Sequence, residues 1–266
     1  MSIEIYKTEK ISSHIWRISE LNIANCYLVV GEKKAALIDC GLGVSSLLEE
    51  VRKITSLPII LIATHSHVDH VGGAKEFGKI HVHYADAPIL RWSNSFSQRI
   101  DFLKTHKLVE KFKEEGIVLP HYKPYLFMIP FGDTKIFDLG GVKLETIRTK
   151  GHSIGSCNFK VKADNIILVG DNFIPFLLLQ YAYASSLKKW VEGCEILFKK
   201  MDNCVLYGGH GKNPVSFDGL KWQYENAKKI IASTAKNDSK SDKKIVTLQN
   251  EEHEHLIIRY RTDKIL

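Results

Sequence analysis

A short apolar stretch followed at once by a polar run constrains this chain more than any other feature of its sequence. Residues 59–63 read IILIA, and residues 64–70 read THSHVDH. A continuous apolar run of this length is typical of a strand that is buried on both faces of an α/β sheet. Sites in such folds usually lie beyond the carboxyl ends of the strands. The polar run, with its three histidines and one aspartate, is therefore predicted to be part of a functional site rather than an exposed loop.

The spacing within this run suits metal binding. His65 and His67 are two residues apart, so in an extended or turning backbone their side chains leave on the same side. Asp69 and His70 continue beyond the end of the strand. One segment can thus offer two nitrogen ligands to one metal ion, and an oxygen and a nitrogen to a second. The glycine pair at 72–73 allows the chain to turn sharply close to the metals.

Three later segments repeat this arrangement. In each of them, a predicted strand ends next to a glycine and a residue with a metal-binding side chain. These residues are His152, Asp171 and His210. Taken singly, each is more often a loop residue with an ordinary hydrogen bond than a ligand. Because the same design recurs along the chain, we expect all of these segments to contribute to one metal site.

The remaining pattern predicts an α/β protein. Short runs rich in β-branched and aromatic residues predict strands, and apolar residues at helical spacing predict helices. The predicted strands cover residues 14–19, 25–30, 35–39, 59–63, 80–83, 135–138, 142–149, 156–162, 166–169, 205–207, 245–248 and 255–260, and the predicted helices cover residues 45–55, 84–113, 185–201 and 216–236. No repeat or shift in composition divides the chain. We therefore expect a single domain over residues 1–266, with a helical insertion at 84–130 and a polar linker and terminal hairpin at 237–266.

The overall composition argues against several classes of protein. The chain has five cysteines and no CxxC pair, so neither a disulfide framework nor a cysteine-based zinc site is expected. No apolar run approaches the roughly 20 residues needed to span a bilayer, and the N-terminus lacks the apolar core of a signal peptide. We therefore expect a cytoplasmic protein without a membrane partner. The net charge is +7, but the lysines are scattered, so nucleic acid is not an expected partner.

Together, these motifs resemble the metallo-β-lactamase superfamily. The HxHxDH motif of that family matches residues 65–70, and its later histidine, aspartate and histidine match His152, Asp171 and His210. An early strand that ends in aspartate and glycine is matched by residues 38–41. The resemblance runs in the correct order from about residue 14 to residue 211. It implies a four-layered αββα sandwich, with the helical insertion over the cleft.

The resemblance also implies a role for each candidate ligand. One metal would be bound by His65, His67 and His152, a second by Asp69, His70 and His210, and Asp171 would bridge the two. Asp39 would steady the metal-binding loop from behind. Imidazole and carboxylate ligands suit two divalent ions, with zinc as the expected metal and iron or manganese as alternatives.

The implied activity is hydrolysis. Metal coordination can lower the pKa of water to about 7, so the expected nucleophile is a hydroxide that bridges the metals. Asp69 is the catalytic residue expected to orient it. The expected substrate is a small molecule, anionic or strongly polarised, with a carboxylic ester, thioester or lactone bond. Two alternatives remain open, namely a phosphodiesterase or ribonuclease of the same fold and a metal-binding sensor without catalysis.

Within the superfamily, the chain resembles the glyoxalase II and lactonase group. The antibiotic-hydrolysing class has a cysteine where Asp171 stands, so β-lactamase activity is not expected. Ser156 stands where glyoxalase II usually has another histidine. Lactonases place a tyrosine after the bridging aspartate, which makes Tyr181 and Tyr183 candidates for the substrate pocket, with Phe173 as a further apolar candidate. The physiological substrate, the metal used in the cell and the oligomeric state stay open, and a homo-oligomer is allowed.

Overall fold

The largest element of the fold is a seven-stranded sheet. The computed structural model describes residues 3–121, 126–236 and 244–266. Strands β1 to β4 pair antiparallel, and strands β4 to β7 pair parallel. In spatial order the strands are β1 (Tyr6–Lys10), β2 (Ile15–Glu20), β3 (Ala24–Val30), β4 (Ala35–Ile38), β5 (Ile59–Ile62), β6 (Lys79–His83) and β7 (Phe127–Phe131).

Two further sheets come from the second half of the chain. The larger has five strands in the order β13 (Val205–Gly208), β11 (Ile166–Gly170), β10 (Cys157–Val161), β9 (Lys143–Arg148) and β8 (Ile136–Asp138). Its strands are antiparallel neighbours except for β11 and β13, which are parallel. The smaller sheet has three strands in the order β12 (Phe176–Leu179), β15 (Ile257–Arg261) and β14 (Ile245–Gln249).

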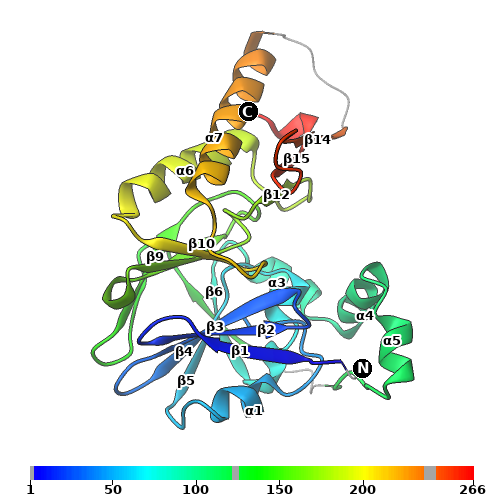
Figure 1. The fold of residues 1–266 in the computed structure, drawn as a ribbon, viewed down its shortest axis with the longest axis vertical. Coiled ribbons are helices and arrows are strands. Elements are labelled where there is room, and N and C mark those ends of the chain that lie inside the picture. The colour runs from blue at the N-terminus through cyan, green and yellow to red at the C-terminus, as the bar shows by residue number, and fades with distance from the viewer. Residues whose placement is uncertain (1–2, 122–125, 237–243) are drawn as a thin grey trace.

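Helices cover the outer faces of the two large sheets, as Figure 1 shows. Leu47 and Val51 of α1 pack on the seven-stranded sheet, and Trp190 and Leu197 of α6 pack on the five-stranded sheet. The inner faces meet in a core that includes the fully buried Phe159. The layers therefore follow the expected αββα order. The helices are α1 (Leu47–Arg52), α2 (Val68–Val71), α3 (Ala87–Ser93), α4 (Phe96–Thr105), α5 (Val109–Glu114), α6 (Leu187–Lys200) and α7 (Phe217–Lys236), with 3-10 turns η1 (Ala74–Glu76), η2 (Lys162–Asp164) and η3 (Thr262–Lys264).

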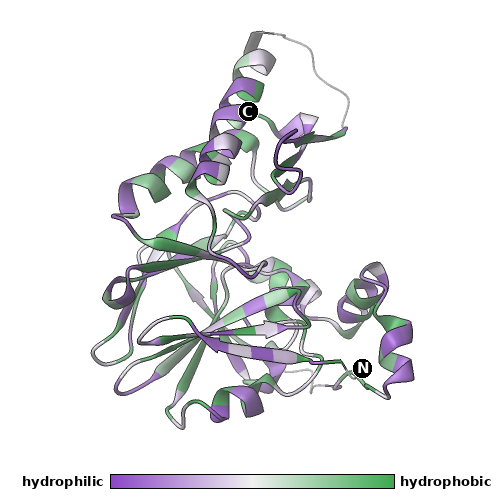
Figure 2. Ribbon diagram, viewed as in Figure 1, coloured by the Kyte–Doolittle hydropathy of each residue, from purple (hydrophilic) through white to green (hydrophobic). Residues whose placement is uncertain are grey.

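The amphipathic pattern of the sequence explains how α6 is placed. Its buried residues include Leu187, Trp190, Val191, Cys194 and Leu197, which recur at the spacing of one helix face. Figure 2 shows hydrophobic and hydrophilic positions alternating around α6 and α7. Burial of this apolar face against the sheet holds the helix in place, because helix propensity alone stabilises isolated helices only marginally.

The predicted helical region at 84–113 forms three helices, α3, α4 and α5. The chain leaves the helical conformation after α3, and α4 begins after Ser95. The Ser95 hydroxyl accepts a hydrogen bond from the Gln98 backbone N–H and caps α4. Leu103 of α4 and Phe112 of α5 pack on Leu42, which lies in the loop after β4. The insertion therefore has an apolar core of its own that also attaches it to the main sandwich.

Three strands were not predicted from the sequence. The first is β1, which lies at one edge of the seven-stranded sheet. The second is β7, which contains Pro130 and lies at the other edge of that sheet, where a missing backbone N–H is tolerated. The third is β12, which pairs parallel with β15. The predicted terminal hairpin is present as β14 and β15, whereas residues 237–243 of the predicted linker lie outside the described residues.

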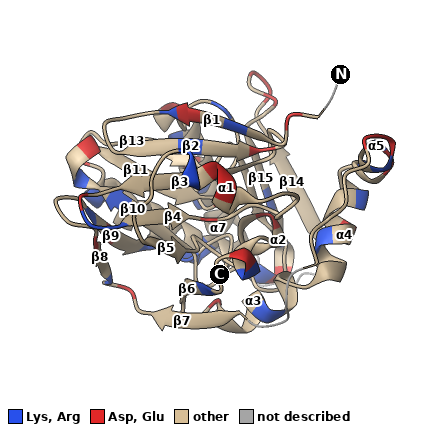
Figure 3. Ribbon diagram, turned by 90° about the horizontal axis from the view of Figure 1, so that it is seen from below, with Lys and Arg blue, Asp and Glu red and all other residues tan. Residues whose placement is uncertain are grey.

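Charged residues of both signs are interspersed along the elements in Figure 3. Within the described parts of the chain, none of the helices combines the length and the apolar character that crossing a bilayer requires.

Candidate metal centre

Parallel pairing of β4 and β5 brings the first candidate residues together. Ile38 pairs with Ile62, so the residues that follow the two strands lie side by side. Asp39 takes a left-handed backbone conformation with φ of 61°. Its carboxylate accepts hydrogen bonds from the Thr64 backbone N–H at 2.7 Å and from His70 Nδ1 at 2.9 Å. Asp39 therefore holds the ring of His70, one of the ligand candidates, through its Nδ1 atom.

The second parallel pair, β11 and β13, delivers two more candidates. Gly170 pairs with Gly208, so Asp171 and His210 leave the same edge of the five-stranded sheet. A Cβ atom on Gly209 would lie 2.3 Å from Asp171 Oδ1, so only glycine permits this close approach. The two sheets are joined here as well, because the Tyr27 hydroxyl of β3 donates to the Gly208 carbonyl at 2.6 Å.

All seven predicted ligands lie together at the edge where the two sheets meet. They form two groups, within each of which the ligand atoms lie within 4.8 Å of one another. The first group is His65, His67, His152 and Asp171, and the second is Asp69, His70 and His210. Asp171 also lies close to the second group, 3.4 Å from His70 Nε2 and 2.9 Å from His210 Nε2.

The imidazole rings are held so that one nitrogen of each faces inward. His152 Nδ1 donates to the Leu178 carbonyl at 2.8 Å, and His210 Nδ1 donates to the Ile23 carbonyl at 2.7 Å. Each bond directs the other ring nitrogen, Nε2, toward the remaining ligand candidates. His152 Nε2 faces His67 Nδ1 at 2.7 Å. Fixing a ligand histidine through its second nitrogen is a common feature of metal sites in proteins.

The charge state of the metal-free cluster differs between the two groups. Burial lowers the pKa of His65 and of His67 well below the usual range, which leaves both neutral. Burial also acts to lower the pKa of His210, but the carboxylates of Asp171 and Asp69 outweigh it and raise the value to about 9. Burial acts to raise the pKa of Asp171, but His210 and His70 outweigh it and hold that pKa well below its usual range. Neutral imidazoles and an ionised carboxylate are the forms that bind divalent metals.

The donor set and its unpaired atoms fit metal ions. His65 Nε2 is buried and has no hydrogen-bond partner among the described residues, although His65 Nδ1 lies 3.0 Å from Thr64 Oγ1. An unpaired buried polar atom costs free energy unless a ligand satisfies it. Nitrogen and carboxylate donors together suit zinc, iron and manganese. The residues present therefore fit a divalent metal site.

Two supporting residues were not recognised from the sequence. Asp86 is fully buried just before α3, and its carboxylate accepts from the backbone N–H groups of Ser66 and Gly155 and from the hydroxyl of Ser153. It thus joins the insertion to both of the loops that carry His65, His67 and His152. Asn172 Oδ1 accepts from the His152 backbone N–H at 2.8 Å. The partners of the Asp86 carboxylate lie at least 20 residues away along the chain, so no local signal pointed to its role.

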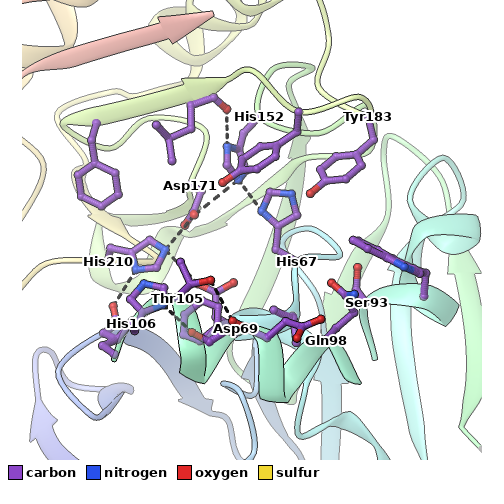
Figure 4. Close-up of a pocket in the computed structure, with 18 of the residues that line it drawn as sticks. His67, Asp69, Ser93, Gln98, Thr105, His106, His152, Asp171, Tyr183 and His210 are labelled. Carbon is purple, nitrogen blue, oxygen red and sulfur yellow. Dashed lines mark hydrogen bonds and ion pairs between the residues drawn. The ribbon is translucent and has the colours of Figure 1, made fainter. Parts of the chain in front are cut away.

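A cavity of about 780 Å³ opens beside the ligands. Figure 4 shows His152, Asp171 and His210 on one side of it, and Gln98, Thr105 and His106 of the insertion on the other. Tyr181 and Tyr183 both line the cavity, and their rings stack on each other with centroids 5.5 Å apart.

The expectation for Phe173 was wrong. This residue is fully buried and packs against Trp190 in the core beneath the five-stranded sheet. Phe176, three residues later on β12, lines the cavity instead. The sequence pattern did not reveal β12, and without that strand the side of the chain that faces the cavity could not be assigned.

Several known proteins are similar to this chain in sequence. A sequence model of the Metallo-beta-lactamase superfamily matches residues 20–210. The chain is 27% identical over 226 residues to the acyl-coenzyme A thioesterase MBLAC2 of Homo sapiens, covering 77% of this chain and 80% of that protein. It is 26% identical over 149 residues to the hydroxyacylglutathione hydrolase GloC of Haemophilus influenzae, covering 55% of this chain and 65% of that protein.

Solved structures share the fold at lower identity. The metallo-β-lactamase DIM-1 superposes with a TM-score of 0.60 at 15% identity, covering 86% of this chain and 99% of that one. A metallo-β-lactamase from Pontibacter korlensis superposes with a TM-score of 0.57 at 19% identity, covering 83% of this chain and 97% of that one. The sequence match covers more than half of the chain and includes every predicted ligand. The chain therefore belongs to the metallo-β-lactamase superfamily.

Proposed function

We propose that this protein is a metal-dependent hydrolase of thioesters and related esters, with zinc as its metal. The observation that carries the proposal is the pair of ligand groups that share Asp171 on the wall of a substrate-sized cavity. When bound, the metals would lower the pKa of water and polarise a carbonyl group. His65, His67, His152 and Asp171 would hold one ion, and Asp69, His70, His210 and Asp171 the other.

Residues around the cavity can assist the reaction. Asp69 lines the cavity, and its Oδ2 lies 3.4 Å from His210 Nε2. From this position its carboxylate can orient the attacking water and accept a proton from it. Burial raises the pKa values of Tyr181 and Tyr183, so both hydroxyls stay protonated at neutral pH. Either can donate a hydrogen bond to the substrate carbonyl, where negative charge develops during attack.

The named relatives favour thioesters among the candidate substrates. Their printed names describe a thioesterase that acts on acyl-coenzyme A and a hydrolase of hydroxyacylglutathione. A phosphodiesterase finds less support, because none of the described residues that line the cavity is a lysine or an arginine. We further propose a small-molecule substrate and a cytoplasmic location.

A substrate panel tests the proposal. The protein is loaded with zinc, its metal content is measured, and it is assayed with acyl thioesters, lactones and bis-p-nitrophenyl phosphate. We expect thioester cleavage that Asp171→Ala abolishes together with metal binding, while Asp138→Ala, at an exposed carboxylate of β8, leaves both intact. Cleavage of the phosphodiester alone would replace the proposal with the phosphodiesterase alternative. A metal-loaded protein that cleaves nothing in the panel would refute it.

A further inference from the structure

The cavity wall away from the metal ligands is mainly apolar. Its apolar residues come from four segments that lie far apart in the sequence. They are Ile23, Val68, Trp92, Phe102, Phe176 and Leu178. Its uncharged polar residues include Asn22, Ser93, Gln98 and Thr105, together with Tyr181 and Tyr183. Such a wall favours an uncharged chain, which loses little on leaving water.

Few of the described residues on this wall are charged, and the clearest charge among them is negative. Apart from the ligand candidates, Asp101 of α4 is the one acidic residue among the described lining residues, and they include no lysine or arginine. Lys104 pairs with Asp101 at 3.5 Å, but it is not one of the described lining residues. His106 donates from Nδ1 to the Phe102 carbonyl at 2.9 Å, and its ring stacks on Phe102. Among the described residues of the wall, no lysine or arginine is therefore available to pair with a carboxylate.

A charged group would be poorly accommodated in this space. A carboxylate that leaves water without a paired cation carries a large free-energy cost, and the charge of Asp101 adds repulsion. The phosphates of a coenzyme A would meet the same difficulty. They would therefore lie outside the cavity, with the acyl group inside.

We propose that the cavity binds the acyl group of the substrate and selects uncharged, largely apolar acyl groups over those that end in a carboxylate. This inference rests on the proposed thioesterase function. It assigns Asp101 as a specificity-determining residue at the cavity rim, where its side chain is 60% exposed. The metal-binding end of the cavity receives the scissile carbonyl, and the chain extends toward α3, α4 and β12.

Two thioesters of N-acetylcysteamine test the inference, because they share an uncharged leaving group and a chain length. Hexanoyl and adipoyl groups have the same six-carbon chain, but the adipoyl group ends in a carboxylate. For the zinc-loaded protein we expect kcat/KM to be at least about 20-fold higher for the hexanoyl thioester, mostly through KM. Equal kcat/KM values, or a preference for the adipoyl thioester, would overturn the inference.

A pair of matched variants locates the effect. Asp101→Lys should raise the ratio of kcat/KM for the adipoyl thioester to kcat/KM for the hexanoyl thioester about tenfold. Glu110→Lys is the control, since it makes the same charge change on α5 and breaks a similar pair, 2.9 Å from Lys113. Glu110 is not among the lining residues. If both variants shifted the ratio equally, the discrimination would come from the overall charge, and the assignment of Asp101 would fail.

A binding measurement separates this inference from the proposed function. Ketone analogues, in which a methylene group replaces the thioester sulfur, cannot be hydrolysed, and their affinity is measured by calorimetry. We expect the hexanoyl analogue to bind at least about 20-fold more tightly than the adipoyl analogue. Absence of thioester cleavage together with this order of binding would refute the proposed function alone. Cleavage of both thioesters with the opposite order of binding would refute the inference alone.

Discussion

The seven candidate ligands differ in the charge that each carries before a metal binds. Burial lowers the pKa values of His65 and His67, whereas nearby carboxylates outweigh burial and raise those of His70 and His210. At neutral pH the first two histidines are therefore neutral and the other two are imidazolium ions. A protonated histidine must lose its proton before it can bind a metal. The two ligand groups should consequently respond differently to pH.

We expect metal binding to the group that contains His210 to release protons, and metal binding to the group that contains His65 to release few protons. The pKa of His210 is raised to about 9, so the affinity of the group with Asp69, His70 and His210 should rise with pH from 7 to 9. The affinity of the group with His65 and His67 should stay nearly constant over this window. Zinc titration by calorimetry, in buffers of different ionisation enthalpy, measures the protons released at each step. His210→Ala should lower the release at the second step, and equal release at both steps would contradict this assignment of charge.

The position of α4 depends on a single buried arginine. Arg99 donates from Nε to the Leu42 carbonyl at 2.8 Å, from one terminal nitrogen to Pro120 O at 2.8 Å, and from the other to Gly43 O. Glu20 accepts from the backbone N–H groups on the opposite side of the same loop, at 3.0 Å from Gly43 N. The loop after β4 is thus held between the main sheet and the insertion. Periodicity predicted a helix in this region, but it carried no information about the loop on which the helix docks.

Arg99→Ala should loosen the insertion without removing the metals. Loss of these hydrogen bonds from a charged donor leaves buried carbonyl oxygens unpaired, which we expect to cost on the order of 2 kcal/mol of local stability. Hydrogen exchange over residues 96–121 should accelerate and KM should rise, while metal content stays constant. Arg91→Ala, on the exposed face of α3, is the matched control and should change none of these. Loss of metal in Arg99→Ala would show that the insertion supports the metal loop itself.

The candidate metal ligands come from both of the large sheets of the molecule. The ligands in residues 65–70 follow β5 of the seven-stranded sheet, whereas His152, Asp171 and His210 follow strands of the five-stranded sheet. A ligand that binds only the folded state stabilises it by mass action. Metal binding should therefore stabilise the whole sandwich and not merely one loop.

Removal of the metals should lower the melting temperature of the entire domain. At a free zinc concentration 100 times Kd, each bound ion contributes about 2.7 kcal/mol to the free energy of unfolding. Calorimetric melts of the zinc-loaded protein, of the chelated protein and of the protein after zinc is restored measure this contribution. We expect a fall of several degrees that zinc reverses. An unchanged melting temperature after the metal has been stripped would mean that the ions do not connect the sheets.

The sequence by itself determined the class of fold and indicated the candidate ligands. His65, His67, Asp69 and His70 occupy one short segment after an apolar strand, and local spacing is enough to identify such a segment. The order of the remaining motifs then supported the αββα family, which the match to residues 20–210 confirms. Most strands and helices followed from periodicity for the same reason, because a half-buried element repeats its pattern within a few residues.

Only the tertiary structure decided what surrounds the ligands. Asp86 is 20 residues from Ser66 and 67 residues from Ser153 along the chain, yet its carboxylate bonds to both. Phe176 rather than Phe173 faces the cavity, because β12 pairs with β15 from the far end of the chain. These positions depend on contacts between segments remote in sequence, and no local pattern encodes such contacts. The sequence therefore indicated the candidate metal ligands, while long-range packing shaped the cavity in which a substrate would be chosen.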